Sequence, residues 1–110
     1  MPAAPLETGN LFRLVPSDSS AEQVEVLLES TSLRLERIVS FGAASPPGFW
    51  YEQDRSEWVL LASGRATLVF EDSGSIDLEA GDYVLIPAAR RHRVESTSKD
   101  ATWLALHFDP

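Results

Sequence analysis

The chain of 110 residues contains no cysteine, which excludes disulfides, a thiolate nucleophile and cysteine-ligated zinc. Nine basic residues against seventeen acidic ones give a net charge of −8. That charge repels phosphate backbones and anionic lipids, so we expect neither a nucleic-acid nor a membrane partner. The sequence has no apolar run of about 18 residues, as a membrane-spanning helix would need. Residues 1–10, MPAAPLETGN, lack the order of a secretion signal, and a cytoplasmic protein is expected.

What the sequence does contain is a series of short, branched apolar segments separated by glycine and proline turns. The length allows a single domain over residues 11–110, preceded by a flexible segment over residues 1–10. The spacing predicts eight or nine strands in an antiparallel sandwich or barrel, an all-β fold. The expected strands cover residues 11–15, 33–41, 57–63, 65–71, 75–78, 83–87, 91–97 and 102–108, together with one segment that has two readings.

That segment is SDSSAEQVEVLLES, residues 17–30. Ser20 and Glu22, followed by glutamates and leucines, suit the start of a helix. Val24, Val26 and Leu28 instead repeat with the period of a strand. The strand is the favoured interpretation.

Two motifs resemble those of the cupin family, which are small double-sheet jelly rolls. Gly81, Pro87 and His92 match the spacing of the second cupin motif, with Ala89 in place of a glycine and Ser96 in place of an asparagine. Glu57 and Gly64, in EWVLLASGRATL, match the second half of the first motif. The resemblance implies an antiparallel jelly-roll barrel whose mouth holds Glu57 and His92.

The first half of the first motif departs from the family, which places two histidines there. Depending on the register, the corresponding residues are Trp50 and Glu52, or Tyr51 and Gln53. By resemblance, Gln53, Glu57 and His92 are the candidate ligands of one divalent metal ion (Fe, Mn, Ni or Zn). This set has fewer strong ligands than the family's three imidazoles and one carboxylate, so the alternative is that no metal is bound.

Without a metal, Glu57 and His92 are a candidate acid/base pair, because a carboxylate raises the proton affinity of a neighbouring imidazole. Trp50 and Tyr51, in the aromatic stretch FWYEQ, are candidate walls of a substrate pocket. Arg37 interrupts the apolar stripe of Leu33 and Leu35 and is expected to face Glu57 across the barrel, as a structural group or a substrate anchor.

Three further residue types are expected outside the site. Strand alternation places Arg91 and Arg93 opposite His92, facing solvent or acidic neighbours. Trp58 alternates with Glu57 and is expected in the core or at a dimer interface. His107 is expected to be structural, near an exposed strand end and satisfied by backbone or water.

Two functions from different classes follow. One is a metal-dependent or acid/base enzyme acting on a small organic molecule inside the barrel. The other is a non-catalytic binding or sensing module for a sugar-like or carboxylate ligand, which has lost the usual metal site. The resemblance also implies a homodimer, with residues 11–15 as a candidate exchanged strand.

Overall fold

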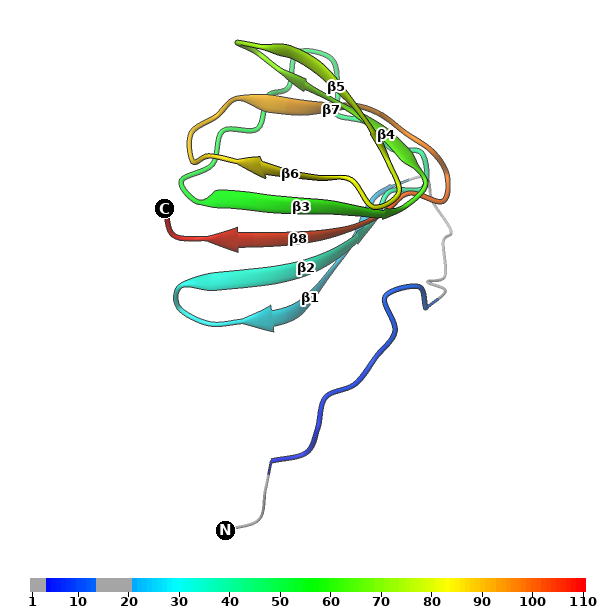
Figure 1. The fold of residues 1–110 in the computed structure, drawn as a ribbon, viewed down its shortest axis with the longest axis vertical. Helices are drawn as coiled ribbons and strands as arrows, with labels where there is room; N and C mark the ends of the chain where they lie inside the picture. Colours follow the sequence, from blue (N-terminus) through cyan, green and yellow to red (C-terminus); the bar gives the residue numbers. More distant parts are fainter. Residues whose placement is uncertain (1–3, 14–20) are drawn as a thin grey trace.

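In the computed structural model, which describes residues 4–13 and 21–110, the chain forms two antiparallel sheets (Figure 1). The described part contains eight strands and no helix. Accordingly, no helix within it is long and apolar enough to cross a membrane. The strands are β1 (Gln23–Glu29), β2 (Leu33–Val39), β3 (Ser56–Ser63), β4 (Arg65–Phe70), β5 (Gly74–Glu79), β6 (Tyr83–Ile86), β7 (His92–Thr97) and β8 (Thr102–Phe108).

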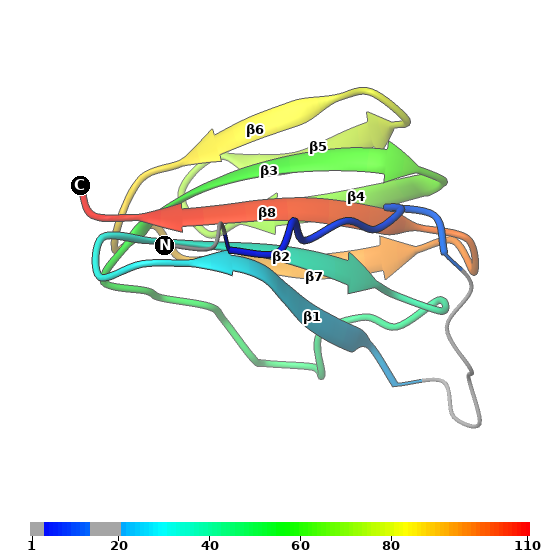
Figure 2. The same cartoon turned by 90° about the horizontal axis from the view of Figure 1, so that it is seen from below.

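The larger sheet has the order β1-β2-β8-β3-β6 and the smaller one the order β5-β4-β7. Strands distant in sequence are neighbours, since β8 inserts between β2 and β3. In Figure 2 the larger sheet lies in front, and the smaller sheet of β5, β4 and β7 lies behind it as a second layer. The prediction of an all-β, antiparallel double-sheet jelly roll is confirmed.

The core fills the space between the two layers. The larger sheet contributes Leu61 and Trp103, and the smaller sheet contributes Leu68 and Phe70, all of them at most 5% exposed. The indole Nε1–H of Trp103 donates to the buried Ser40 hydroxyl at 2.9 Å, so its one polar atom is satisfied inside the core. Alternation of buried and half-buried positions along β4 and most of β8 is what produces this layer.

Gly64 joins β3 to β4 with a positive φ of 82°. A Cβ at this position would lie 2.7 Å from the Ala101 Cα and 2.5 Å from the Ser98 Oγ. Both the backbone angle and the close approach therefore require glycine. This turn lets β3 leave the larger sheet and continue as β4 in the smaller one.

The segment with two readings is a strand: β1 runs along one edge of the larger sheet. The strand expected at residues 11–15 is not formed over residues 11–13, and residues 14–15 lie outside the described part. Here the side-chain Oδ1 of Asn10 accepts the Phe12 N–H at 2.8 Å, and the backbone carbonyl of Asn10 accepts the Arg13 N–H at 3.1 Å. These bonds close a turn, which competes with an extended backbone.

Candidate functional site

A cavity of about 290 Å³ opens between the two sheets. Its lining is divided between aliphatic or aromatic side chains and a group of carboxylates and imidazoles. Among the described residues, no lysine or arginine lines it. The lining residues are Glu22, Val24, Glu36, Ile38, Tyr51, Gln53, Glu57, Val59, Leu68, Ile86, His92, Val94, Trp103, Ala105 and His107.

Glu57 and His92 face one another inside this cavity. Glu57 is near the start of β3 in the larger sheet, and His92 is the first residue of β7 in the smaller sheet. The Glu57 Oε1 and His92 Nε2 atoms are 3.6 Å apart, and the two side chains are 13% and 7% exposed. Thus the two residues expected to share one cavity do share it, one from each layer.

The loop before His92 determines how its ring is presented. The chain turns after Pro87, where the Arg90 N–H donates to the Pro87 carbonyl at 3.2 Å. Within the turn Ala89 takes a φ of 65°, which explains why the cupin motif has glycine at this point. The carbonyl of Arg90 lies 2.9 Å from His92 Nδ1. A carbonyl only accepts, so Nδ1 carries a proton and Nε2 is directed at Glu57.

This arrangement favours the charged form of His92. Burial of the ring opposes protonation, but the Glu57 carboxylate and the Arg90 carbonyl outweigh it and raise the pKa of His92 above its ordinary value. With Nδ1 donating to the carbonyl, a neutral ring would direct a lone pair from Nε2 at the carboxylate. Protonation of Nε2 converts that repulsion into attraction.

Tyr51 and Gln53 line the cavity, whereas Trp50 and Glu52 do not. The register of the first motif is therefore Tyr51/Gln53. Tyr51 pairs with His92 through backbone hydrogen bonds of 2.7 and 3.1 Å, and the two rings stack with centroids 5.5 Å apart. The expectation that Trp50 lines the pocket is wrong: its ring lies 5.8 Å from the Arg91 guanidinium outside the cavity.

Arg37 is also not part of the pocket. It is buried, but on the opposite face of β2 from the cavity-lining Glu36 and Ile38. Its guanidinium forms an ion pair with Glu25 at 2.8 Å and donates to the carbonyls of residues 10, 11 and 13 at 3.2–3.3 Å. Arg37 therefore holds the N-terminal segment against the outside of the sheet.

His107 and Glu36 belong to the cavity, which sequence reasoning missed. His107 Nε2 lies 2.9 Å from Glu36 Oε1 and 3.7 Å from Glu57 Oε2. The ring is only 7% exposed and its partners are carboxylates, so the expectation of an exposed strand end satisfied by backbone or water is wrong. The residues form a chain, His92–Glu57–His107–Glu36, in which Glu57 bridges two imidazoles.

A third carboxylate, Glu22, also lines the cavity. Burial and the charges of Glu36 and Glu57 raise its pKa. Burial, together with Glu22 and Glu57, likewise raises the pKa of Tyr51, which keeps the phenol protonated. Burial is the larger cause of both shifts, and the neighbouring carboxylates add to it.

The donor set does not fit a tightly held divalent metal as it is arranged. In residues 4–13 and 21–110, no three His, Asp or Glu side chains converge as ligands of one ion. Gln53 offers a neutral amide and Tyr51 a protonated phenol where the cupin motif has two imidazoles. The His107 Nε2 is directed at Glu36, and the carboxylates and imidazoles pair with one another.

The remaining side chains around the site point elsewhere. Arg91 pairs with Glu71 at 3.3 Å on the surface, as expected, and Arg93 donates to the Ser45 carbonyl at 3.0 Å. Trp58 is on the outer face of β3, where its ring lies 5.6 Å from that of Tyr83.

Comparisons with known proteins agree with this architecture. The Cupin domain family matches residues 39–107. Among curated proteins, none matches significantly. The crystal structure of a "putative mannose-6-phosphate isomerase" from Ralstonia eutropha JMP134 is 43% identical, covering 94% of this chain and 99% of that one, with a TM-score of 0.89.

Two structures of lower identity share the fold. A cupin superfamily protein from Desulfitobacterium hafniense is 19% identical, with 96% of this chain and 94% of that chain covered and a TM-score of 0.77. An RmlC-like cupin from Desulfovibrio desulfuricans is 17% identical, with 94% and 96% covered and a TM-score of 0.76. With its two motifs, its two sheets and the family match over residues 39–107, this chain belongs to the cupin family.

Proposed function

We propose that this cupin is an enzyme that transfers protons on a small organic molecule bound between its two sheets. The observation that carries the proposal is Glu57, a carboxylate 13% exposed that lies between two imidazoles at 3.6 and 3.7 Å. An acid and a base held close together in a desolvated cavity are what proton abstraction and return require.

The roles follow from charge. His92, whose pKa is raised, serves as the acid, and the Glu57 carboxylate serves as the base. Glu57 removes a proton from a carbon next to a carbonyl, and the C–H electron pair forms a C=C bond. The carbonyl π pair meanwhile takes the proton of His92 Nε2, which yields an enol. Return of a proton to the neighbouring carbon, or to the other face of the same carbon, completes an isomerisation or an epimerisation.

The Ralstonia eutropha protein supports an isomerisation, because the name given to it is that of an isomerase. The fold itself selects no reaction. The assignment therefore depends on the pair Glu57 and His92 rather than on the barrel.

The test is solvent deuterium exchange. The protein is incubated in D₂O with a panel of hydroxy- and amino-ketones and aldehydes, and loss of the C–H signal is followed by proton NMR. We expect exchange of at least one compound, reduced at least 100-fold in Glu57→Gln and in His92→Asn. Glu95→Gln, on the exposed part of β7, is the matched control and should retain the rate. Exchange that survives in Glu57→Gln would contradict the proposal.

Two alternative functions can be tested on the same protein. Tyr51 and Gln53, in place of the family's imidazoles, favour a non-catalytic binding or sensing module; binding of panel compounds without any exchange would select it. A divalent metal at Gln53, Glu57 and His92 is the other alternative. Elemental mass spectrometry of untagged protein would select it if about one ion per chain were found and lost in His92→Ala.

A further inference from the structure

We infer that Tyr51 and Phe70 are positioning residues of the proposed reaction, which hold the ring of His92 between their aromatic faces. We call these two rings the aromatic clamp. The inference rests on the proposed function, since it takes His92 as the acid, and it adds two residues that act through that acid. It is carried by the strand pairing, by the geometry of the rings and by the contact at the edge of the imidazole.

Backbone pairing places the three rings in one row on the inner face of the smaller sheet. His92 lies directly opposite Phe70 of β4 on one side, and on the other side it pairs with Tyr51, from the segment between β2 and β3. Tyr51 and His92 exchange both backbone hydrogen bonds, at 2.7 and 3.1 Å. Residues paired in this way have Cα atoms about 5.5 Å apart and side chains on the same face. The spacing of the sheet therefore brings one ring against each side of the imidazole.

The rings of the clamp are closer to stacked than to edge-on against His92. The Tyr51 and His92 centroids are 5.5 Å apart, with 25° between the ring planes. The Phe70 and His92 centroids are 5.8 Å apart, with 31° between the planes. Both distances lie within the about 6 Å at which an aromatic face attracts a cation. The clamp therefore favours a charged imidazole, whereas aliphatic neighbours would only remove it from water.

The clamp supplies a restraint that the hydrogen bond of His92 does not supply. The contact of Nδ1 with the Arg90 carbonyl, at 2.9 Å, fixes one edge of the ring but leaves the ring free to tilt about that edge. Aromatic faces on both sides fix the plane as well. With edge and plane both fixed, Nε2 is held at 3.6 Å from Glu57 Oε1. Such placement matters for proton transfer, because a misplacement of about 1 Å can lower a rate by about 100-fold.

Each ring of the clamp has a further contact of its own. The Phe49 ring packs edge-on against Tyr51, with centroids 4.9 Å apart and planes at 89°. The Arg90 guanidinium lies 5.6 Å from the centroid of Phe70. Arg90 thus contacts the clamp through its side chain and His92 through its carbonyl. Two of the three consecutive aromatic residues, Phe49 and Tyr51, therefore have a role in presenting His92.

The first measurement follows the His92 ring by NMR in the protein without ligand, assigned with His107→Gln. Its carbon-bound protons should resonate upfield of their positions in urea-unfolded protein, because they face aromatic rings. ¹³C relaxation gives the order parameter of the His92 Cδ2–H bond. In Tyr51→Leu both the upfield shift and the order parameter should decrease, and Tyr51→Phe, which keeps the ring, should rescue both. Phe70→Leu should act as Tyr51→Leu does.

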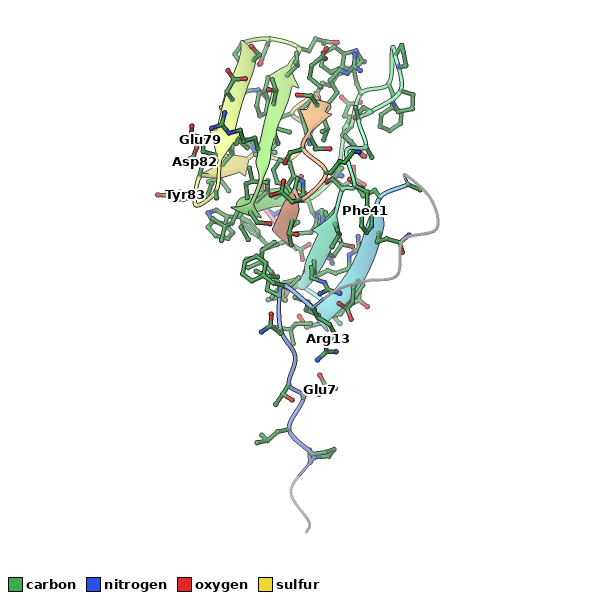
Figure 3. The ribbon with its side chains drawn as sticks, turned by 90° about the vertical axis from the view of Figure 1, so that its right-hand side faces the viewer. Glu7, Arg13, Phe41, Glu79, Asp82 and Tyr83 are labelled. Carbon is green, nitrogen blue, oxygen red and sulfur yellow. The ribbon has the colours of Figure 1, made fainter. Side chains whose placement is uncertain are left out.

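Tyr83→Leu is the matched control. It removes an aromatic ring that lies 5.6 Å from the Trp58 ring at an angle of 33°, a geometry close to that of Phe70 and His92. Tyr83 is 65% exposed, and Figure 3 shows it projecting outward from the sheet. Its loss should leave the His92 signals unchanged. Because Phe70 is buried in the core and Tyr51 is only half-buried, Tyr51→Leu decides the question if Phe70→Leu does not fold.

The second measurement uses a panel compound that exchanges its C–H proton with solvent deuterium. We expect kcat and kcat/KM to fall together in Tyr51→Leu, by at least about tenfold, because a misplaced acid weakens the transition state rather than ligand binding. Tyr51→Phe should rescue kcat, and Tyr83→Leu should not change it.

An unchanged order parameter of His92 in Tyr51→Leu would overturn the inference, whatever the activity of that variant. A loss of kcat in Tyr51→Phe equal to that in Tyr51→Leu would also overturn it, since the effect would then come from the phenol hydroxyl rather than from the ring. If no panel compound exchanges, the proposed function fails, while the NMR measurement still decides whether the clamp holds His92.

Discussion

Replacing Glu57 with glutamine removes the charge that the two imidazoles share while keeping the shape of the side chain. At 3.6 Å, a carboxylate and an imidazolium attract by about 1 kcal/mol in water and by about 5 kcal/mol at an effective dielectric constant of 20. Both side chains are at most 13% exposed, so the interaction lies above the lower limit. We therefore expect Glu57→Gln to lower the pKa of His92.

The same change alters how stability depends on pH. The pKa of His92 is raised on folding, so its contribution is complete below the unfolded value of about 6.5 and is lost as pH rises through the folded value. The parent protein should lose at least about 1 kcal/mol of unfolding free energy from this pair across that range. In Glu57→Gln that loss should shrink.

The assay uses the fact that the chain has only two histidines. Long-range ¹H–¹⁵N spectra of the rings give one titration curve each, assigned with His107→Gln, and urea unfolding at pH 6 and pH 9 gives the stabilities. Glu36→Gln is the matched control, because Glu36 contacts His107 and not His92. The reasoning is refuted if His92 titrates at the same pH in Glu57→Gln as in the parent, or if Glu36→Gln lowers its pKa equally.

Three further predictions concern the scaffold and are measured by urea unfolding. Gly64→Ala should lower the free energy of unfolding by more than about 3 kcal/mol, because the added Cβ would lie 2.7 Å from the Ala101 backbone. Gly74→Ala has a similar φ of 87° but open space around the added Cβ, and should cost only about 1–2 kcal/mol. Equal losses in the two variants would contradict the close approach at Gly64. Ser40→Ala should cost about 1–3 kcal/mol of unfolding free energy, since it leaves the buried Trp103 Nε1–H without its acceptor. Ser75→Ala, at an exposed position, should be neutral. A neutral Ser40→Ala would refute the role of the Ser40 hydroxyl as that acceptor. Arg37→Met should speed amide exchange over residues 10–13 and destabilise the protein, because it removes the hydrogen bonds to their carbonyls. Arg91→Met, on the surface, should do neither. Unchanged amide exchange in Arg37→Met would show that residues 10–13 are held by other contacts.

The positions of most strands could be predicted because each carries its own signal. Residues 65–70 and 102–108 alternate between buried and less buried positions, and turn residues such as Gly64 and Pro87 separate the strands. The strand at residues 23–29 was distinguishable from a helix by its period of two. The motifs also predicted correctly that Glu57 and His92 face one cavity, since their spacing specifies where each strand begins.

The prediction for Arg37 failed because alternation identifies two faces but does not tell which is inside. Leu33 and Leu35 form an apolar stripe with Arg37, whereas Glu36 and Ile38 form the face that lines the cavity. The outer face of the larger sheet is as apolar as an interior one, so the choice could not be made from one strand. Part of that outer face is covered by the chain's own N-terminal segment, whose carbonyls Arg37 binds, which is why a buried arginine is found there.

His107 and Glu36 could not be found for a different reason: their proximity to Glu57 depends on pairing between strands distant in sequence. β8 lies between β2 and β3, with His107 directly opposite Glu57 and diagonal to Glu36. Nothing local to residues 102–108 encodes that neighbourhood. The acidic chain of the cavity is thus a product of the jelly-roll topology, which inserts the last strand beside the one that bears the motif carboxylate.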